Sequence, residues 1–334
     1  MVLSVGVVGT GNIGSYHIER LAGRLSGVRV SAVFDVATQR AEQIADSIGA
    51  RAHAEGMDLV ADDDVDAVVI TSPGPTHAEF VLACIGAGKP VLSEKPLATT
   101  VDDCEKVLEA EIAHGSRLAQ VGFMRRYDHG YGQLKAAIDD GSIGEPLIVH
   151  CVHRNATVPE AFTSDMSQTD SVVHEIDTAR WLLGEEFTTA TVLRPRRSPL
   201  AAEHLQDPQL VLLENEAGVI VEVESFVNAQ YGYDVRCEVV GSEGTVELET
   251  PSVASLTREG QRGRSVPTDW KERFDDAFHV EFQQWVDGLG SSTVSGPSAW
   301  DGYAATAVSV TCVEALNSGR RTPIHLREKP ALYR

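Results

Sequence analysis

Short apolar runs alternate with segments of helical periodicity over the first 120 residues of the chain. The runs have the length of buried β-strands, and the segments between them place apolar residues at helical spacing, as Ala41, Ile44 and Ala45 do. Thr76 is a candidate helix N-cap, with Glu79 at the capping-box position. This alternation is typical of βαβ units that build a parallel sheet. The expected strands are 2–8, 28–34, 65–70, 90–93 and 117–123, and the expected helices are 38–48, one that begins at Thr76, and 101–114.

The pattern changes at Leu147. From there, strand-like runs follow one another with short turns between them, which predicts a mostly antiparallel sheet. Beyond residue 125, helical periodicity occurs in one segment before Leu147, in one segment between the strand-like runs and in two segments near the end of the chain. The expected strands are 147–152, 188–194, 209–214, 218–229, 233–241 and 244–249, and the expected helices are 131–138, 170–183, 278–289 and 300–316.

A glycine-rich turn, Gly-Thr-Gly-Asn-Ile-Gly at 9–14, joins the first predicted strand to a helix-like segment. In this context Gly9 permits a tight turn, Gly11 lets the backbone approach a pyrophosphate, and Gly14 allows close packing of helix on strand. The first free N–H groups of the helix then face the phosphate charge. The motif therefore predicts a dinucleotide site.

The second predicted strand ends in Asp35, 21 residues after Gly14. A carboxylate at this position accepts hydrogen bonds from the adenosine ribose hydroxyls, whereas the 2′-phosphate of NADP would meet a like charge. We therefore predict NAD as the cofactor. Two alternatives stay open: Asp35 is a solvated acid at a strand end, or Arg40, close in sequence, lets the site tolerate the phosphate of NADP.

These patterns together predict an α/β fold in two domains, in line with a length of 334 residues. The N-terminal domain, 1–125, is expected to be an NAD-binding Rossmann fold. The C-terminal domain, 126–334, is expected to be an α+β domain with a large open, mostly antiparallel sheet that binds substrate and forms the oligomer. In an alternative arrangement, its last helices and C-terminal segment pack back on the first domain.

Composition narrows the classes of partner. The net charge of −21 at pH 7 argues against nucleic acid and against an anionic membrane surface. The five cysteines are scattered and form no Cys-x-x-Cys pair, which indicates reduced thiols in a cytoplasmic protein. We expect no signal peptide, because no basic region precedes an apolar stretch, and no membrane span, because no run of about 18 apolar residues occurs.

The stretch Glu94-Lys95-Pro96, together with the glycine turn, resembles the glucose–fructose oxidoreductase/inositol dehydrogenase (Gfo/Idh/MocA) family. The resemblance covers the whole chain and implies the two-domain fold described above, a small polyol substrate and a homo-oligomer, a tetramer, assembled through the open face of the second sheet. Longer stretches resemble the inositol dehydrogenase branch of the family; they are 123–128, 153–158, 170–177, 231–234 and 295–303.

Three polar side chains, Asp170, His174 and Asp177, are spaced i, i+4 and i+7, so that on a regular helix they share one face. Apolar neighbours predict that this helix is at least half-buried, and a solvated polar face is the alternative. Oxidation of an alcohol needs a base for the hydroxyl proton, and a neutral imidazole suits that task near neutral pH. In line with the family's dyad, we expect His174 to be the general base and Asp170 to orient its ring.

Lys95 directly follows a predicted strand of the parallel sheet. Its ammonium can donate to the reacting oxygen and lower the free energy of developing alkoxide charge. Pro96 restricts the backbone of Lys95 and helps to hold its direction. Without the resemblance, an ordinary surface lysine in a turn would be the favoured interpretation.

The resemblance implies NAD-dependent oxidation of myo-inositol at C2 to 2-keto-myo-inositol (scyllo-inosose). The alternatives are scyllo- or D-chiro-inositol, or an aldopyranose such as glucose. Ser171 stands where relatives often carry Thr, which keeps the hydroxyl. The expected cofactor contacts are Gly9, Thr10, Gly11, Asn12, Ile13, Gly14, Asp35, Val36, Arg40, Thr71, Ser72, Pro73, His77, Glu94, Lys95 and Pro96. The expected substrate contacts are Lys95, Met124, Arg125, His153, Asn155, Asp170, Ser171, His174 and Tyr233.

Two rival functions follow from the same residues. A non-catalytic NAD-binding sensor would keep the glycine turn and Asp35 without needing Lys95 or His174. A metal-dependent alcohol dehydrogenase would use metal ligands in place of Lys95, but no cysteine-rich structural zinc site accompanies them, so we predict no metal. Its candidate ligand sets are Asp170, His174 and Asp177, or His150, Cys151 and His153.

Overall fold

The computed structural model describes residues 2–248, 255–290 and 294–334 of the chain. These residues form two compact units. The first unit comprises Met1–Phe123, Phe278–Thr306 and Arg327–Arg334, and the second comprises Met124–Ala277 and Ala307–Leu326. The single domain boundary at residue 125 stays a prediction. Each compact unit is assembled from segments that are far apart in sequence.

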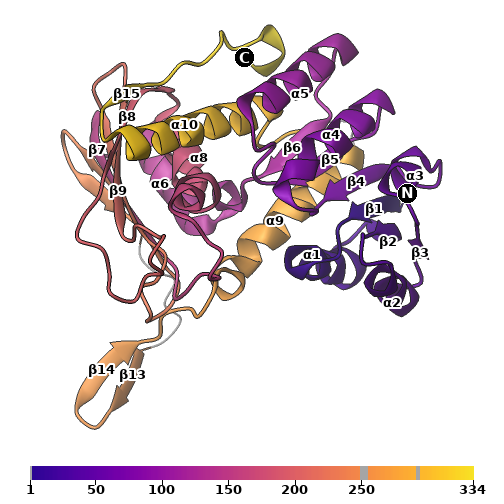
Figure 1. Ribbon diagram of the computed structural model, residues 1–334, viewed down its shortest axis with the longest axis horizontal. Helices are drawn as coiled ribbons and strands as arrows, with labels where there is room; N and C mark the ends of the chain where they lie inside the picture. The colour runs from indigo at the N-terminus through magenta and orange to yellow at the C-terminus, as the bar shows by residue number, and fades with distance from the viewer. Residues whose placement is uncertain (1, 249–254, 291–293) are drawn as a thin grey trace. The chain divides into compact units, whose positions relative to one another are not determined.

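The first unit is built on a six-stranded parallel sheet with the strand order β3-β2-β1-β4-β5-β6 (Figure 1). This order is that of a doubly wound dinucleotide-binding fold, with the switch point between β1 and β4. The predicted Rossmann sheet is therefore confirmed. The strands are β1 (Leu3–Val8), β2 (Val28–Phe34), β3 (Arg51–Ala52), β4 (Ala67–Ile70), β5 (Val91–Glu94) and β6 (Ala119–Gly122), and the helices are α1 (Asn12–Gly23), α2 (Thr38–Ile48), α3 (Gly56–Ala61), the 3₁₀ turn η1 (Gly74–Thr76), α4 (His77–Gly86) and α5 (Val101–His114).

The continuous apolar runs of the sequence become the buried central strands of this sheet. All four residues of β4 are fully buried, as expected for a parallel strand covered on both faces. Helix α5 begins at Thr100, whose side chain accepts a hydrogen bond from the backbone N–H of Asp103, and it ends at Gly115 in a left-handed conformation with φ of 84°. The predicted capping box of α4 is wrong, because the Thr76 side chain bonds Ser72 and the Pro73 carbonyl instead.

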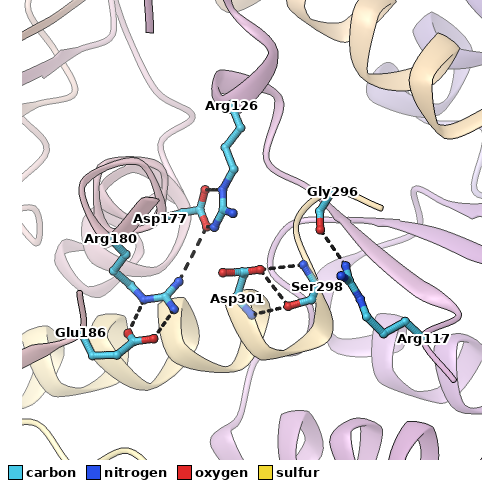
Figure 2. A network of polar contacts seen from close by, with 8 residues as sticks. All are labelled: Arg117, Arg126, Asp177, Arg180, Glu186, Gly296, Ser298 and Asp301. Atoms are coloured by element: carbon cyan, nitrogen blue, oxygen red, sulfur yellow. Dashed lines mark hydrogen bonds and ion pairs between the residues drawn. The ribbon is translucent and has the colours of Figure 1, made fainter. Parts of the chain in front are cut away.

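The C-terminal residues of the first unit are attached to α5 and β6 by one buried carboxylate. Glu111 accepts hydrogen bonds from the backbone N–H groups of Leu118 and Ala119 and from the Tyr333 hydroxyl at 2.6 Å. Helix α10 (Ala299–Ser318) starts in this unit with a reciprocal cap between Ser298 and Asp301, visible in Figure 2.

The second unit contains a seven-stranded sheet with the order β12-β11-β7-β10-β9-β8-β15. Only β7 and β10 pair in parallel, so the predicted mostly antiparallel sheet is confirmed. Helix α8 packs on β7, and α6 packs on α8. The strands are β7 (Pro146–Arg154), β8 (Phe187–Leu193), β9 (Gln209–Asn215), β10 (Ile220–Phe226), β11 (Asp234–Gly241), β12 (Thr245–Glu247) and β15 (Thr322–Pro323), and the preceding helices are η2 (Met124–Tyr127), α6 (His129–Asp139), α7 (Ser164–Met166), η3 (Ser167–Val172) and α8 (Val173–Leu183).

Alternation of apolar and polar residues sets the two faces of this sheet. Along β9, buried positions at Gln209, Val211 and Leu213 alternate with partly exposed ones. A separate hairpin, β13 (Ser255–Arg258) and β14 (Gln261–Arg264), pairs with no other strand of the described residues and stands away from the seven-stranded sheet of its unit in Figure 1. The last residue of the predicted strand 244–249 lies outside the described residues.

Helix α9 (Trp270–Gly290) begins in the second unit and ends in the first. Its backbone leaves helical geometry at Phe274, where φ is −119° and ψ is 16°. The periodicity of 278–289 therefore predicted only the second half of this element. No helix among the described residues combines the length and the apolar character needed to cross a membrane.

Candidate active site

The glycine turn after β1 is tightly packed at Gly9 and Gly14 and has open space at Gly11. Gly9 has a φ of 96°, and a Cβ on it would lie 2.5 Å from the backbone nitrogen of Ser72. A Cβ on Gly14 would collide with the Gly9 carbonyl, whereas nothing lies within 4 Å of the corresponding position on Gly11. Gly11 is also the N-cap of α1. The turn thus fits a pyrophosphate, because it is open where the phosphate would approach and close-packed where helix meets strand.

Asp35 lies directly after β2 and anchors the glycine turn. Its carboxylate accepts hydrogen bonds from the backbone N–H of Thr10 at 2.7 Å and from the Thr10 hydroxyl at 2.9 Å, and Arg40 donates to it at 2.8 Å. Burial acts to raise the pKa of Asp35, but the hydrogen bonds from Ala37, Arg40 and Thr10 outweigh it and lower the pKa to about 2. The carboxylate is therefore ionised at neutral pH, as ribose recognition requires.

Replacing Asp35 by serine is expected to weaken NAD binding about 10–100-fold, because a hydrogen bond to a charged group contributes about 1.5–3 kcal/mol. NADP should lose less or gain, since Arg40 is then released to pair with the 2′-phosphate. Isothermal titration calorimetry with both cofactors measures the two dissociation constants. An unchanged ratio of the NAD and NADP constants would contradict the role of Asp35 in cofactor choice.

The loops that follow β1, β4 and β5 are tied to one another by hydrogen bonds. The Thr71 hydroxyl donates to the Gly9 carbonyl at 2.7 Å. The buried ring of His77 lies between the carbonyls of Ser72 and Pro96, each 2.7 Å from a ring nitrogen. These loops lie at the carboxyl edge of the sheet, where open α/β sheets bind their ligands. Pro73 lies in the loop after β4, and Val36, which is 89% exposed, lies in the loop after β2.

Glu94 makes contacts that the sequence did not predict. Its side chain accepts a hydrogen bond from His17 on α1 at 2.8 Å, and Arg20, one helical turn later, lies 3.2 Å from the other ring nitrogen of His17. His17 and Arg20 are buried on α1, and neither was predicted as a site residue. A histidine three residues before an arginine on a buried helix face was the available signal.

Four predicted substrate residues of the second unit come together. They lie on η2, β7, α8 and the turn before β11 and are Arg125, His153, His174 and Tyr233. The rings of His153 and His174 stack with centroids 6.3 Å apart, and the Tyr233 ring meets His153 edge-on at 5.9 Å. Met124 is buried beside Arg125 on η2, and Asn155 follows β7 with its backbone bonded to Phe226 and Ala229. This part of the predicted site is a compact group of side chains.

Glu175 holds this group together, and the sequence did not single it out. It accepts from Arg125 and from His153 Nδ1 at 3.0 Å, and all three side chains are buried. Burial alone would raise the pKa of Glu175, but the charge of Arg125 and the contact with His153 lower it, which favours the ionised carboxylate. Arg125 is only 1% exposed and pairs with Glu175. Glu175 also fixes the ring of His153, which stacks on His174.

Replacing Glu175 by glutamine is expected to destabilise the protein by roughly 3–5 kcal/mol, because it leaves the buried Arg125 charge without its partner. Urea denaturation followed by circular dichroism measures this loss. Glu222→Gln, which breaks an exposed pair with His150, is the matched control and should cost about 0–1 kcal/mol. A Glu175→Gln variant as stable as this control would contradict the proposed weight of the buried pair.

That Asp170, His174 and Asp177 share one face stays a prediction. Asp170 lies, exposed, in the π-helical segment η3, whereas His174 and Asp177 lie on α8, which begins at Val173. His174 is on α8 and 9% exposed, and Ser171 is buried in η3.

Asp177 pairs with arginine side chains inside the second unit. Its carboxylate accepts from Arg126 at 2.9 and 2.5 Å, with Arg180 3.9 Å away (Figure 2). Arg180 in turn makes two hydrogen bonds of 2.6 Å to Glu186. Asp177 is thus a buried partner of two arginines.

Neither proposed set of metal ligands forms a cluster. Within 2–248, 255–290 and 294–334, no three histidine, cysteine or acidic side chains are grouped so that they could hold a metal ion. His150 lies on the exposed face of β7, whereas Cys151 and His153 are buried. The alternation along the strand places His150 on the opposite face from Cys151 and His153.

Known proteins resemble this chain over its full length. Residues 3–123 match the oxidoreductase family with an NAD-binding Rossmann fold, and residues 135–326 match the C-terminal alpha/beta domain of the same family. Inositol 2-dehydrogenase 3 of Saccharopolyspora erythraea is 54% identical over 333 residues, with 100% of this chain and 98% of the relative covered. Inositol 2-dehydrogenase of Burkholderia multivorans is 51% identical over 336 residues, and both chains are fully covered.

A solved structure agrees with the fold. The crystal structure of myo-inositol dehydrogenase from Lactobacillus casei in complex with NAD(H) and myo-inositol superposes with a TM-score of 0.97 at 36% identity, and both chains are covered completely. The family resemblance and the NAD-binding oxidoreductase class predicted from the sequence are confirmed. The chain belongs to the Gfo/Idh/MocA oxidoreductase family.

Proposed function

We propose that this protein oxidises myo-inositol at C2 to 2-keto-myo-inositol, with NAD as the hydride acceptor. The observation that carries the proposal is the group formed by Arg125, His153, His174 and Tyr233 in the second unit. A compact group of hydrogen-bond donors and acceptors suits a substrate that carries a ring of hydroxyl groups. Such a site rejects analogues that lack one hydroxyl, because a buried polar side chain is then left unpaired. The names of relatives at 54% and 51% identity support the same substrate.

The first unit supplies the cofactor site of this proposal. The glycine turn and the N-terminus of α1 hold the pyrophosphate, and Asp35 accepts hydrogen bonds from the ribose. When bound, NAD accepts the hydride at the nicotinamide C4. At the ribose end of the site, Arg40 donates a hydrogen bond to Asp35.

His174 takes the proton from the reacting hydroxyl. Its ring packs on His153, which Glu175 and Arg125 hold in place, so the imidazole is presented in one orientation. Asp170, one turn earlier in η3, is the proposed partner that stabilises the imidazolium once the proton has been transferred. Lys95, directly after β5, donates its ammonium hydrogen bond to the reacting oxygen.

The test is NADH formation at 340 nm with purified protein. Myo-inositol, scyllo-inositol, D-chiro-inositol and glucose are each supplied with NAD and with NADP. We expect turnover of myo-inositol with NAD. Turnover of only another polyol would keep the reaction type and overturn the substrate. Binding of NAD without any turnover would favour the NAD-binding sensor.

We also propose a homotetramer assembled through the outer face of the seven-stranded sheet. Ile148, Leu193 and Ile220 on its strands are large apolar side chains that are 37%, 47% and 41% exposed. Light scattering measures the mass of the assembly. A cytoplasmic location is supported by the five free cysteines, all of them buried.

A further inference from the structure

The backbone around Lys95 is attached to the rest of the first unit on both sides. Glu94 ends β5, and its buried carboxylate also accepts a hydrogen bond from the backbone N–H of Lys95 at 3.2 Å. Pro96 follows, and its carbonyl accepts from His77. The residue before Lys95 and the residue after it are therefore each bonded to a buried histidine.

The contact on the Glu94 side has a defined direction. Arginine has only donors, so His17 Nδ1, which faces Arg20, must accept. The single ring proton is then on Nε2 and is donated to Glu94 at 2.8 Å. Burial lowers the pKa of His17, against the opposing effect of Glu94, which favours this neutral form. The ring is also packed against Phe282 and Phe278 of α9, with centroids 4.4 and 5.2 Å away.

The contact on the Pro96 side is made by a second buried histidine, His77. Both neighbours of His77 are backbone carbonyls, which only accept, and each lies 2.7 Å from a ring nitrogen. A ring nitrogen that carries a proton donates to the carbonyl that faces it. His77 therefore lies between the loop after β4, at Ser72, and the loop after β5, at Pro96.

We propose that His17 and His77 are positioning residues for Lys95: the first holds Glu94 through a chain that starts at Arg20, and the second holds Pro96 through the loop after β4. The proposal rests on the role assigned to Lys95 under the proposed function. Neither histidine needs to touch the substrate. A displacement of about 1 Å at a reacting group can cost about 10²-fold in rate, so a fixed backbone on both sides of Lys95 matters for turnover.

The variants separate hydrogen bonding from simple loss of a side chain. His17→Leu removes both contacts of the ring, whereas His17→Gln keeps an amide N–H for Glu94 and a carbonyl oxygen for Arg20. His77→Phe fills the space of the ring and donates nothing. His53→Leu, which breaks a histidine–carboxylate pair with Asp62 after β3, is the matched control. Melting temperatures establish that each variant is folded.

Steady-state kinetics give the first readout. We expect His17→Leu and His77→Phe to lower kcat about 10–100-fold with a smaller change in KM, and we expect His17→Gln to recover most of the loss. In a Lys95→Met background, His17→Leu should cause little further loss, because it acts through the side chain already removed. Full additivity in that background, or a kcat equal to that of His53→Leu, would overturn the proposal.

A second readout does not depend on turnover, so it separates this proposal from the proposed function. Reductive methylation with ¹³C-formaldehyde labels the six lysines of the chain, and the Lys95→Arg variant assigns the Lys95 methyl resonance. In the wild type we expect the Lys95 resonance at a chemical shift different from that of exposed Lys106. In His17→Leu and His77→Phe the Lys95 resonance should move toward the Lys106 resonance. In His17→Gln it should keep its wild-type chemical shift. A Lys95 resonance unchanged in both variants would overturn the positioning role, even if no polyol is oxidised.

Discussion

Replacing His174 by alanine is expected to lower kcat by about 10²–10⁴-fold, the usual contribution of a positioned general base. The proton of the reacting hydroxyl then has only water as an acceptor. The loss should fall on kcat and on kcat/KM alike, because the interaction removed is made in the transition state. Stopped-flow or steady-state NADH absorbance measures it. Exogenous imidazole is expected to restore part of the rate, since truncation of the side chain vacates the place of a ring.

Two further measurements make the His174 result specific. NAD affinity should be retained in His174→Ala, since the glycine turn and Asp35 are in the first unit. His114→Ala, at the exposed end of α5, is the control for loss of a histidine and should leave kcat unchanged. A His174→Ala variant with kcat within a few-fold of the wild type would remove His174 from the proposed mechanism.

Replacing Lys95 by methionine is expected to lower kcat by about 10²–10³-fold, as the loss of one donor to a developing oxyanion does. Methionine has a similar length and no charge, so the substitution removes the ammonium with little change in volume. The bonds of Glu94 to His17 and of Pro96 to His77 do not involve this side chain and should persist. The decrease is measured with the same absorbance assay at saturating myo-inositol and NAD.

The control for this prediction is Lys106→Met on α5, which removes an exposed lysine paired with Asp103. Its kcat should equal that of the wild type. Lys95→Arg tests charge against geometry: it keeps a cation but replaces a compact ammonium by a planar fork, and we expect only partial activity. If Lys95→Met were as active as Lys106→Met, the reacting oxygen would be stabilised by another group.

The sequence predicted the architecture where local pattern and structure have the same cause. Buried parallel strands are apolar on both faces, and the continuous run that became β4 was therefore readable. Helix α5 spans the predicted residues 101–114, because a side-chain cap and a left-handed glycine, both local features, set its ends. The glycine turn was equally readable, since the crowding around Gly9 and Gly14 excludes other residues.

The sequence was less informative where regular periodicity breaks. The spacing of Asp170, His174 and Asp177 was interpreted as one regular helix, and no residue type indicated that Asp170 lies in a π-helical segment. The predicted capping box at Thr76 is wrong. Its hydroxyl found a better partner in Ser72, across a tight turn.

The sequence by itself determined the two sheets, the dinucleotide turn, the acid at the end of β2 and the family to which the chain belongs. Only the tertiary structure decided the partners of the buried charges. His17 and Glu94 are 77 positions apart, Arg125 and Glu175 are 50, and Arg126 and Asp177 are 51. Periodicity records which face of an element is buried, because it depends on near neighbours in the chain. It cannot record which distant side chain neutralises a buried charge, because the packing of whole elements decides that choice.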